Sequence, residues 1–255
     1  MGFLAEPKIP VIHMVDMKKS RDCRDLVCSE VRHALEEYGC FFVVCNGSIT
    51  EEVNREVFDV LETLFDLPME TKIKNTSEKA YHGYIGQLPF LPLLESMGIE
   101  HAASVHGLYA KLVSEIEETV RKIVFESYGL NKYHESYNES VTYLLRVMKY
   151  RPPNTNETKL GSMSHTDKTF ISILSQNQVK GLEVKTKDNN WIPVIYPPSS
   201  FLVMAGDAFK VPEELVDDAH PRKFNSFDHF GYLDFYDKDS MFDQEYSHVK
   251  SFCGV

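Results

Sequence analysis

The sequence predicts an α+β protein that begins with alternating strands and helices and continues with closely spaced strands. Apolar residues recur every three or four positions over 20–39, 48–68 and 108–129, which indicates helices. Short apolar runs separated by turn residues follow one another from residue 141 to residue 206, which indicates strands. The 255 residues contain no internal repeat, so we expect a continuous globular body.

Residues 9–68 alternate between predicted strands and helices. The run IPVIHM is a short strand, and CFFVVC, residues 40–45, is a buried one. The helix between them spans 20–39, and Gly39 is placed to end it. The next helix begins near Ser48, which stands three residues before Glu51 in capping-box spacing, and it ends by Pro68. The N-terminal third is therefore α/β.

The rest of the chain changes from loop to helix to strands. Residues 79–98 are rich in glycine, proline and aromatic residues and predict an irregular loop. The third helix stops near Gly129. Strand-like runs then follow at 141–150, 169–175, 181–186, 191–196 and 200–206. Their close spacing suggests an antiparallel sandwich or barrel, and we expect the acidic, aromatic tail to wrap the outside.

Composition excludes several classes of function. A net charge of −11 without clustered lysine or arginine disfavours a nucleic-acid partner. No stretch approaches the length of a membrane span, and the N-terminus lacks a secretory pattern, so we expect a cytoplasmic protein that does not bind membranes. The five cysteines are an odd number and are interpreted as reduced thiols, mostly in the core, rather than as a zinc site.

The stretch GSMSHTDKTFISILS, residues 161–175, holds the clearest chemical pattern. His165 and Asp167 are two positions apart at the start of an alternating run, and in a strand such residues point to one face. An imidazole and a carboxylate there can bind neighbouring corners of one metal ion. With a third ligand from another strand, three positions stay open, as in non-haem Fe(II) enzymes. Taken alone, the pair is also a common accident among 10 histidines.

The residues around this pair resemble the catalytic core of plant 2-oxoglutarate and Fe(II)-dependent dioxygenases. The matching blocks are His165-Thr-Asp167, Gly181-Leu-Glu-Val, Trp191-Ile-Pro-Val194, Pro197 to Phe201 and Gly206-Asp207. HALEEYGCFFVV is similar to the N-terminal domain of that family. YHGYIG, YRPP and the final FCGV resemble most the subgroup around the glucosinolate side-chain dioxygenases. The resemblance spans nearly the whole chain.

The resemblance implies a double-stranded β-helix, or jelly roll, core, with an N-terminal α/β region and helices packed outside. It implies Fe(II) held by His165 and Asp167, 2-oxoglutarate as cosubstrate, ascorbate as reductant and a small-molecule substrate from plant specialised metabolism. Tyr150 and Arg151 stand where the family often lines the oxoacid pocket, although a plain role at a strand end fits them equally well. The expected parts are an N-terminal region over 1–100, a connecting helix over 101–140, the jelly-roll core over 141–210 and a C-terminal tail over 211–255.

The family carries a second iron-binding histidine and an Arg-x-Ser strand after the Gly-Asp turn. In this sequence, MAGDAFK is followed directly by the tail VPEELVDDAHP instead. Several dozen residues are missing between Lys210 and Val211, and a smaller shortening lies near Glu100 to Val105, which leaves the predicted core incomplete. His220 follows Asp167 at about the family's spacing, but it stands before a proline in a stretch unlike a core strand. We therefore interpret His220 as a surface histidine.

Two hypotheses follow from the missing segment. The chain is a dioxygenase by descent, with weak oxoacid binding and weak or no turnover, or it is a non-catalytic remnant with a binding role or none. Leaving a buried carboxylate of the oxoacid without its usual cation costs several kcal/mol, which favours low activity.

Overall fold

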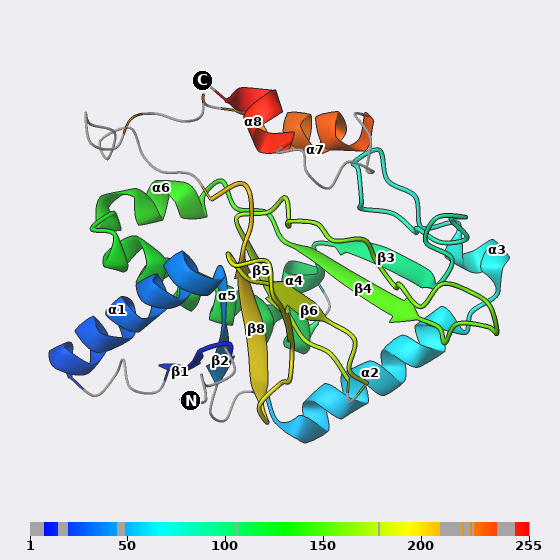
Figure 1. Ribbon diagram of the computed structural model, residues 1–255, viewed down its shortest axis with the longest axis horizontal. Coiled ribbons are helices and arrows are strands. Elements are labelled where there is room, and N and C mark those ends of the chain that lie inside the picture. The colour runs from blue at the N-terminus through cyan, green and yellow to red at the C-terminus, as the bar shows by residue number, and fades with distance from the viewer. Residues whose placement is uncertain are drawn as a thin grey trace. The chain divides into compact units, whose positions relative to one another are not determined.

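The computed structural model describes residues 8–14, 20–44, 49–105, 107–177, 179–209, 221, 225, 227–238 and 248–254 (Figure 1). The chain forms two compact units. Unit 1 consists of Met1–Leu64, His101–Leu145 and Ile171–Ala205, and unit 2 consists of Phe65–Glu100, Arg146–Phe170 and Gly206–Val255. Helices and strands occur in both, which confirms the α+β class. None of the described helices combines the length and the apolar composition that a membrane span requires.

Unit 1 begins with the predicted strand, helix and strand. These are β1 (Val11–His13), α1 (Arg21–Tyr38) and β2 (Cys40–Val44). The side chain of Ser20 accepts a hydrogen bond from the Cys23 backbone N–H at the start of α1, and Gly39 ends the helix with a φ of 69°. Helix α1 buries Val27, Val31 and Ala34, the apolar stripe expected from the sequence.

A four-stranded sheet forms the centre of unit 1, in the order β1-β2-β8-β5. Strand β2 pairs in parallel with β1 and antiparallel with β8 (Ser200–Ala205), and β8 pairs antiparallel with β5 (Ile171–Leu174). A hairpin of β6 (Glu183–Lys185) and β7 (Trp191–Pro193) packs against this core through Val184 and Ile192. All five strand runs predicted after residue 141 therefore contain strands, with β4 in the first of them.

The remaining helices of unit 1 are α2 (Glu51–Phe65), α4 (Ala102–Val105), α5 (Leu108–Ser127), the 3-10 turn η2 (Asn131–Tyr133) and α6 (His134–Asn138). The predicted start of α2 was two residues early. Ser48 lies outside the described residues, and the helix begins at Glu51 with the Thr50 hydroxyl accepting from the Val53 N–H at 3.2 Å. The end of the third helix is confirmed by Gly129, with a φ of 71°.

Unit 2 contains α3 (Met69–Lys72), β3 (Leu94–Glu100), most of β4 (Leu144–Tyr150), α7 (His229–Lys238) and α8 (His248–Cys253). Strands β3 and β4 form a two-stranded sheet. The prediction that residues 79–98 form only an irregular loop was wrong, because β3 begins inside them. A Cβ on Gly98 would lie 2.5 Å from the His82 carbonyl oxygen, so the sheet needs a glycine where the sequence suggested a turn.

Helices α7 and α8 lie in the tail, which showed no clear period in the sequence. They pack through aromatic rings rather than through an aliphatic stripe: the Phe252 ring lies 5.5 Å from that of Tyr232 and 5.2 Å from that of Phe235. Tyr232 is completely buried. Because aromatic residues contribute most of this packing, a 3.6-residue aliphatic pattern was not needed.

Candidate functional site

His165 and Asp167 lie next to each other in unit 2, with 3.8 Å between His165 Nε2 and Asp167 Oδ1. Their side chains are 51% and 28% exposed, so an ion can reach them from solvent. Metal–ligand bonds of about 2.1 Å place two neighbouring corners of an octahedron about 3 Å apart. A small side-chain rotation would therefore bring the imidazole and the carboxylate onto one ion.

We expected the two residues to lie in a strand. They lie instead in a segment without regular secondary structure that ends before β5 begins at Ile171. The backbone of this segment hydrogen-bonds to the Gly206-Asp207 turn instead. The Asp167 carbonyl accepts from the Asp207 N–H at 2.8 Å, and the Thr169 carbonyl accepts from the Ala208 N–H at 3.1 Å. The Gly206-Asp207 turn therefore supplies the backbone hydrogen bonds that a neighbouring strand would supply. The His165 and Asp167 side chains still lie next to each other.

The backbone around His165 sets which ring nitrogen faces Asp167. His165 Nδ1 lies 2.8 Å from the Met163 carbonyl oxygen. Since a carbonyl oxygen only accepts hydrogen bonds, Nδ1 carries a hydrogen. In the neutral ring, the lone pair is then on Nε2, the nitrogen that faces Asp167. This is the arrangement by which metal-binding histidines are oriented in proteins.

Asp207 holds the His165–Asp167 segment through side-chain contacts. One carboxylate oxygen, Oδ2, accepts from the Thr166 hydroxyl at 2.8 Å, from Lys168 Nζ at 2.7 Å and from the Tyr232 hydroxyl at 2.9 Å. Burial, and after it the Asp207 carboxylate, raises the pKa of the Tyr232 hydroxyl, which therefore stays a donor. The two residues that flank Asp167 are thus fixed by one carboxylate.

Gly206 allows this close approach. A Cβ at position 206 would collide with the Thr169 carbonyl oxygen and lie 2.9 Å from the Asp167 carbonyl oxygen. Only glycine leaves room for the two backbones to meet. The Gly-Asp pair is therefore a structural support of the segment that carries His165 and Asp167.

A third protein ligand is not found in the part of the chain that the structure describes. No group of three or more histidine, cysteine, aspartate or glutamate side chains that could hold a metal occurs among these residues. His220 lies outside the described residues, as does the Lys210–Val211 junction. The described site thus offers one nitrogen and one oxygen ligand, which fits an iron ion at two positions.

Tyr150 and Arg151, the predicted oxoacid-pocket residues, have different surroundings. The Tyr150 ring packs against Gly161, four residues before His165, since a Cβ at Gly161 would lie 3.0 Å from it. The Arg151 guanidinium makes a two-pronged ion pair with Glu157, at 2.7 and 2.5 Å. This geometry places the Tyr150 ring against the segment that leads to His165 and directs Arg151 to a partly exposed carboxylate.

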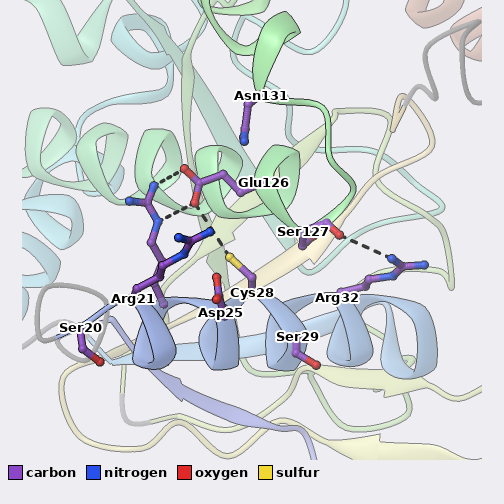
Figure 2. Close-up of a pocket in the computed structure, with 10 residues that line it drawn as sticks. Ser20, Arg21, Asp25, Cys28, Ser29, Arg32, Glu126, Ser127 and Asn131 are labelled. Atoms are coloured by element: carbon purple, nitrogen blue, oxygen red, sulfur yellow. Dashed lines mark hydrogen bonds and ion pairs between the residues drawn. The ribbon is translucent and has the colours of Figure 1, made fainter.

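A different feature is an open groove of about 820 Å³ in unit 1. Figure 2 shows it between α1 and the end of α5. Arg24 donates two hydrogen bonds to Glu126, and burial raises the pKa of the nearby Cys28 thiol. Arg24 pairs with Glu126 in this groove and none of the predicted site residues lines it, so we assign it to helix packing.

Comparison with known proteins agrees with the family resemblance of the sequence. Residues 9–89 match the family described as non-haem dioxygenase in morphine synthesis N-terminal, and residues 141–224 match the 2OG-Fe(II) oxygenase superfamily. The dioxygenase for auxin oxidation 1 from Arabidopsis thaliana, solved with 2-oxoglutarate, superimposes with a TM-score of 0.74 at 23% identity, over 84% of this chain and 100% of that one. The class is therefore that of the 2OG-Fe(II) oxygenases, whose fold is a jelly roll.

Curated relatives identify the family within this class. A probable 2-oxoglutarate-dependent dioxygenase of Arabidopsis thaliana, AOP1, is 35% identical over 91% of this chain and 98% of its own length. A second relative from that plant, named a probable inactive 2-oxoglutarate-dependent dioxygenase, AOP2, is 24% identical over 97% and 98%. The chain belongs to the 2-oxoglutarate-dependent dioxygenase family, as its motifs predicted.

The alignment with AOP1 also bears on the missing segment. It runs over 299 positions, while 91% of the 255 residues is about 232, so about 67 positions of the relative stand opposite gaps in this chain.

Sequence reasoning did not identify the supporting residues of the site. The Gly206-Asp207 block was noticed as a motif without a role, and Lys168 and Tyr232 were not noticed at all. Lys168 directly follows the His-x-Asp motif, so its place in the sequence was a usable signal. No signal marked Tyr232, because its partner Asp207 is 25 residues away.

Proposed function

We propose that this chain is a 2-oxoglutarate/Fe(II) dioxygenase-type protein for a small molecule of specialised metabolism, with His165 and Asp167 as iron ligands. The observation that carries this proposal is the 3.8 Å pair whose histidine is oriented by the Met163 carbonyl. When bound, Fe(II) with the oxoacid supplies the oxidising chemistry of the family. The protein's own contribution is to present Nε2 and a carboxylate oxygen together and to hold the segment through Asp207.

We further propose that the jelly-roll core is incomplete between Lys210 and Val211, and that this chain turns over slowly or not at all. The gap of about 67 positions in the alignment with AOP1 supports a lost segment. The loss would remove the family's second histidine and its Arg-x-Ser. The alternative, a non-catalytic remnant, is favoured by the inactive relative at 24% identity.

The division into 1–100, 101–140, 141–210 and 211–255 remains a proposal, as do a cytoplasmic location and ascorbate as the reductant. Tyr150 is proposed to line the oxoacid pocket, because its ring lies against the segment leading to His165. The same role for Arg151 stays a prediction, and its pairing with Glu157 weakens it. An Arg151→Gln variant with unchanged 2-oxoglutarate affinity would remove Arg151 from the pocket.

Metal binding is tested first, without turnover. Isothermal titration of the wild-type chain with Mn(II), under conditions that exclude oxygen chemistry, should give one site. Binding should weaken at least tenfold in His165→Ala and in Asp167→Asn, because each change removes one of two described ligands. His101→Ala, an exposed histidine in unit 1, is the matched control. Equal Mn(II) affinity in all variants would contradict the proposed ligands.

Activity is tested second, by succinate formation from 2-oxoglutarate with Fe(II) and ascorbate. We expect little or no turnover. Turnover that His165→Ala abolishes would eliminate the non-catalytic alternative. Loss of Mn(II) binding in His220→Ala would show that His220 replaces the missing ligand and would overturn its interpretation as a surface residue.

A further inference from the structure

Arg146, on β4 in unit 2, is a partly buried cation without an acidic partner among the described residues. Its guanidinium donates to the Tyr81 carbonyl oxygen and, at 2.7 Å, to the Ser96 hydroxyl. Its central carbon lies 5.7 Å from the centre of the Tyr81 ring. A guanidinium has five N–H donors, so most of its hydrogen-bonding capacity is still open.

Other buried cations of the described structure are paired differently. Lys72 lies 2.6 Å from a Glu95 oxygen, and Arg121 lies 2.9 Å from a Glu117 oxygen. Removing a charge from water without a counter-ion is costly, and this explains why both have a carboxylate. For Arg146, burial lowers the pKa, and only neutral groups accept its hydrogen bonds. A partly buried guanidinium that has no carboxylate partner in the described chain favours binding of an anion from solution.

Arg146 lies on the same strand face as Tyr150, whose ring contacts the segment that leads to His165. Arg146, Met148 and Tyr150 alternate along β4 and share one face, and Met148 and Tyr150 are 48% and 47% exposed, so that face is open to solvent. The Tyr150 ring lies against Gly161 in the segment that leads to His165.

A second set of contacts connects Arg146 to this segment through aromatic rings. The Tyr81 ring, over which Arg146 lies, is 6.2 Å from the Tyr236 ring, and Lys168 Nζ lies 4.6 Å from the Tyr236 ring centre. All of these residues belong to unit 2. A guanidinium flanked by tyrosine rings is suited to a planar organic acid, since it offers paired N–H donors beside apolar surface.

We propose that Arg146 binds the carboxylate of a small organic acid, contributed by the oxoacid cosubstrate or by the organic substrate. This inference rests on the proposed function only in taking the ligand to be a small molecule. The competing explanation is that Arg146 only ties the Tyr81 loop to β3. The two explanations predict different results. If Arg146 is purely structural, replacing it in a variant that still folds leaves the affinity for a carboxylate unchanged.

The test is titration of the metal-free protein in EDTA with three probes. These are 2-oxoglutarate, 2-oxopentanoate, which has the same chain length without the distal carboxylate, and phenylacetate. If the oxoacid is the source, 2-oxoglutarate binds more tightly than 2-oxopentanoate, and Arg146→Gln removes that difference. If the substrate is the source, phenylacetate binds and Arg146→Gln weakens it about tenfold or more. Either result supports the proposal.

Glutamine at position 146 removes the charge and keeps an uncharged N–H donor on a shorter side chain. Arg55→Gln is the control, because it removes an exposed arginine of unit 1 that belongs to none of the predicted sites. Wild-type protein that binds none of the probes, or affinities that change equally in both variants, would overturn the proposal.

A measurement on the wild-type protein keeps the test valid if Arg146→Gln does not fold. Phenylglyoxal modifies arginine side chains, and peptide mass spectrometry gives the rate at Arg146 and at Arg55 separately. Saturating 2-oxoglutarate or phenylacetate should slow modification of Arg146 at least fivefold and leave the rate at the exposed Arg55 unchanged. Equal rates with and without both acids would refute carboxylate binding at Arg146. Because EDTA is present throughout, failure of this inference is independent of Mn(II) binding at His165 and Asp167.

Discussion

Replacing Asp207 with asparagine is the most direct test of how the His165–Asp167 segment is held. The carboxylate oxygen of Asp207 accepts from Thr166, Lys168 and Tyr232 at 2.7–2.9 Å. The Lys168 and Asp207 side chains are 10% and 18% exposed, so Asp207→Asn leaves a largely buried ammonium without its counter-ion. Breaking a fully buried pair costs about 3–5 kcal/mol, and remaining exposure reduces this to about 2–3 kcal/mol here.

Urea unfolding followed by far-UV circular dichroism measures the change in unfolding free energy. Asp188→Asn, at an exposed position on the β6–β7 turn, is the control and should change stability by less than about 0.5 kcal/mol. Titration of Asp207→Asn with Mn(II) should also show weaker binding, because the segment carrying His165 and Asp167 loses its anchor. A change in stability no larger than that of the control would refute the role given to Asp207.

Three further predictions concern residues in one or the other of the two units. Gly206→Ala should lower the free energy of unfolding by about 3 kcal/mol, since its Cβ meets backbone atoms, whereas Gly181→Ala, with nothing within 4 Å of the added Cβ, should be close to neutral in the same urea assay. Arg121→Met should cost about 3–5 kcal/mol by leaving a buried glutamate without its cation, and a Tm equal to wild type would contradict this. The Arg151 guanidinium, and after it the Asn154 backbone N–H, lower the pKa of Glu157 to about 2, so their stabilising effect is present above pH 4.5 and is lost as pH falls toward 2. In Arg151→Gln, carboxyl NMR titration should find a higher midpoint that still lies below 4.5, because the Asn154 N–H remains, and an unchanged midpoint would contradict the pairing.

Local patterns predicted the elements whose causes are local. Helix α1 ends where Gly39 indicated, because a left-handed glycine acts within one turn of the helix. The strands after residue 141 were predicted from short apolar runs between turn residues, since such runs and turns act over a few residues. The start of α2 was missed because Thr50 competes with Ser48 as a cap, and the two are equivalent in sequence terms.

The sequence by itself determined the family, the α+β class and the pairing of His165 with Asp167, because residues two apart in an extended chain are neighbours whatever surrounds them. Only the tertiary structure decided what holds that pair in place. Asp207 meets Lys168 from 39 residues away, and Arg151 turns toward Glu157 while Arg146 stays without a carboxylate among the described residues. Such contacts depend on which distant segments come together, and no periodicity or spacing along the chain encodes them.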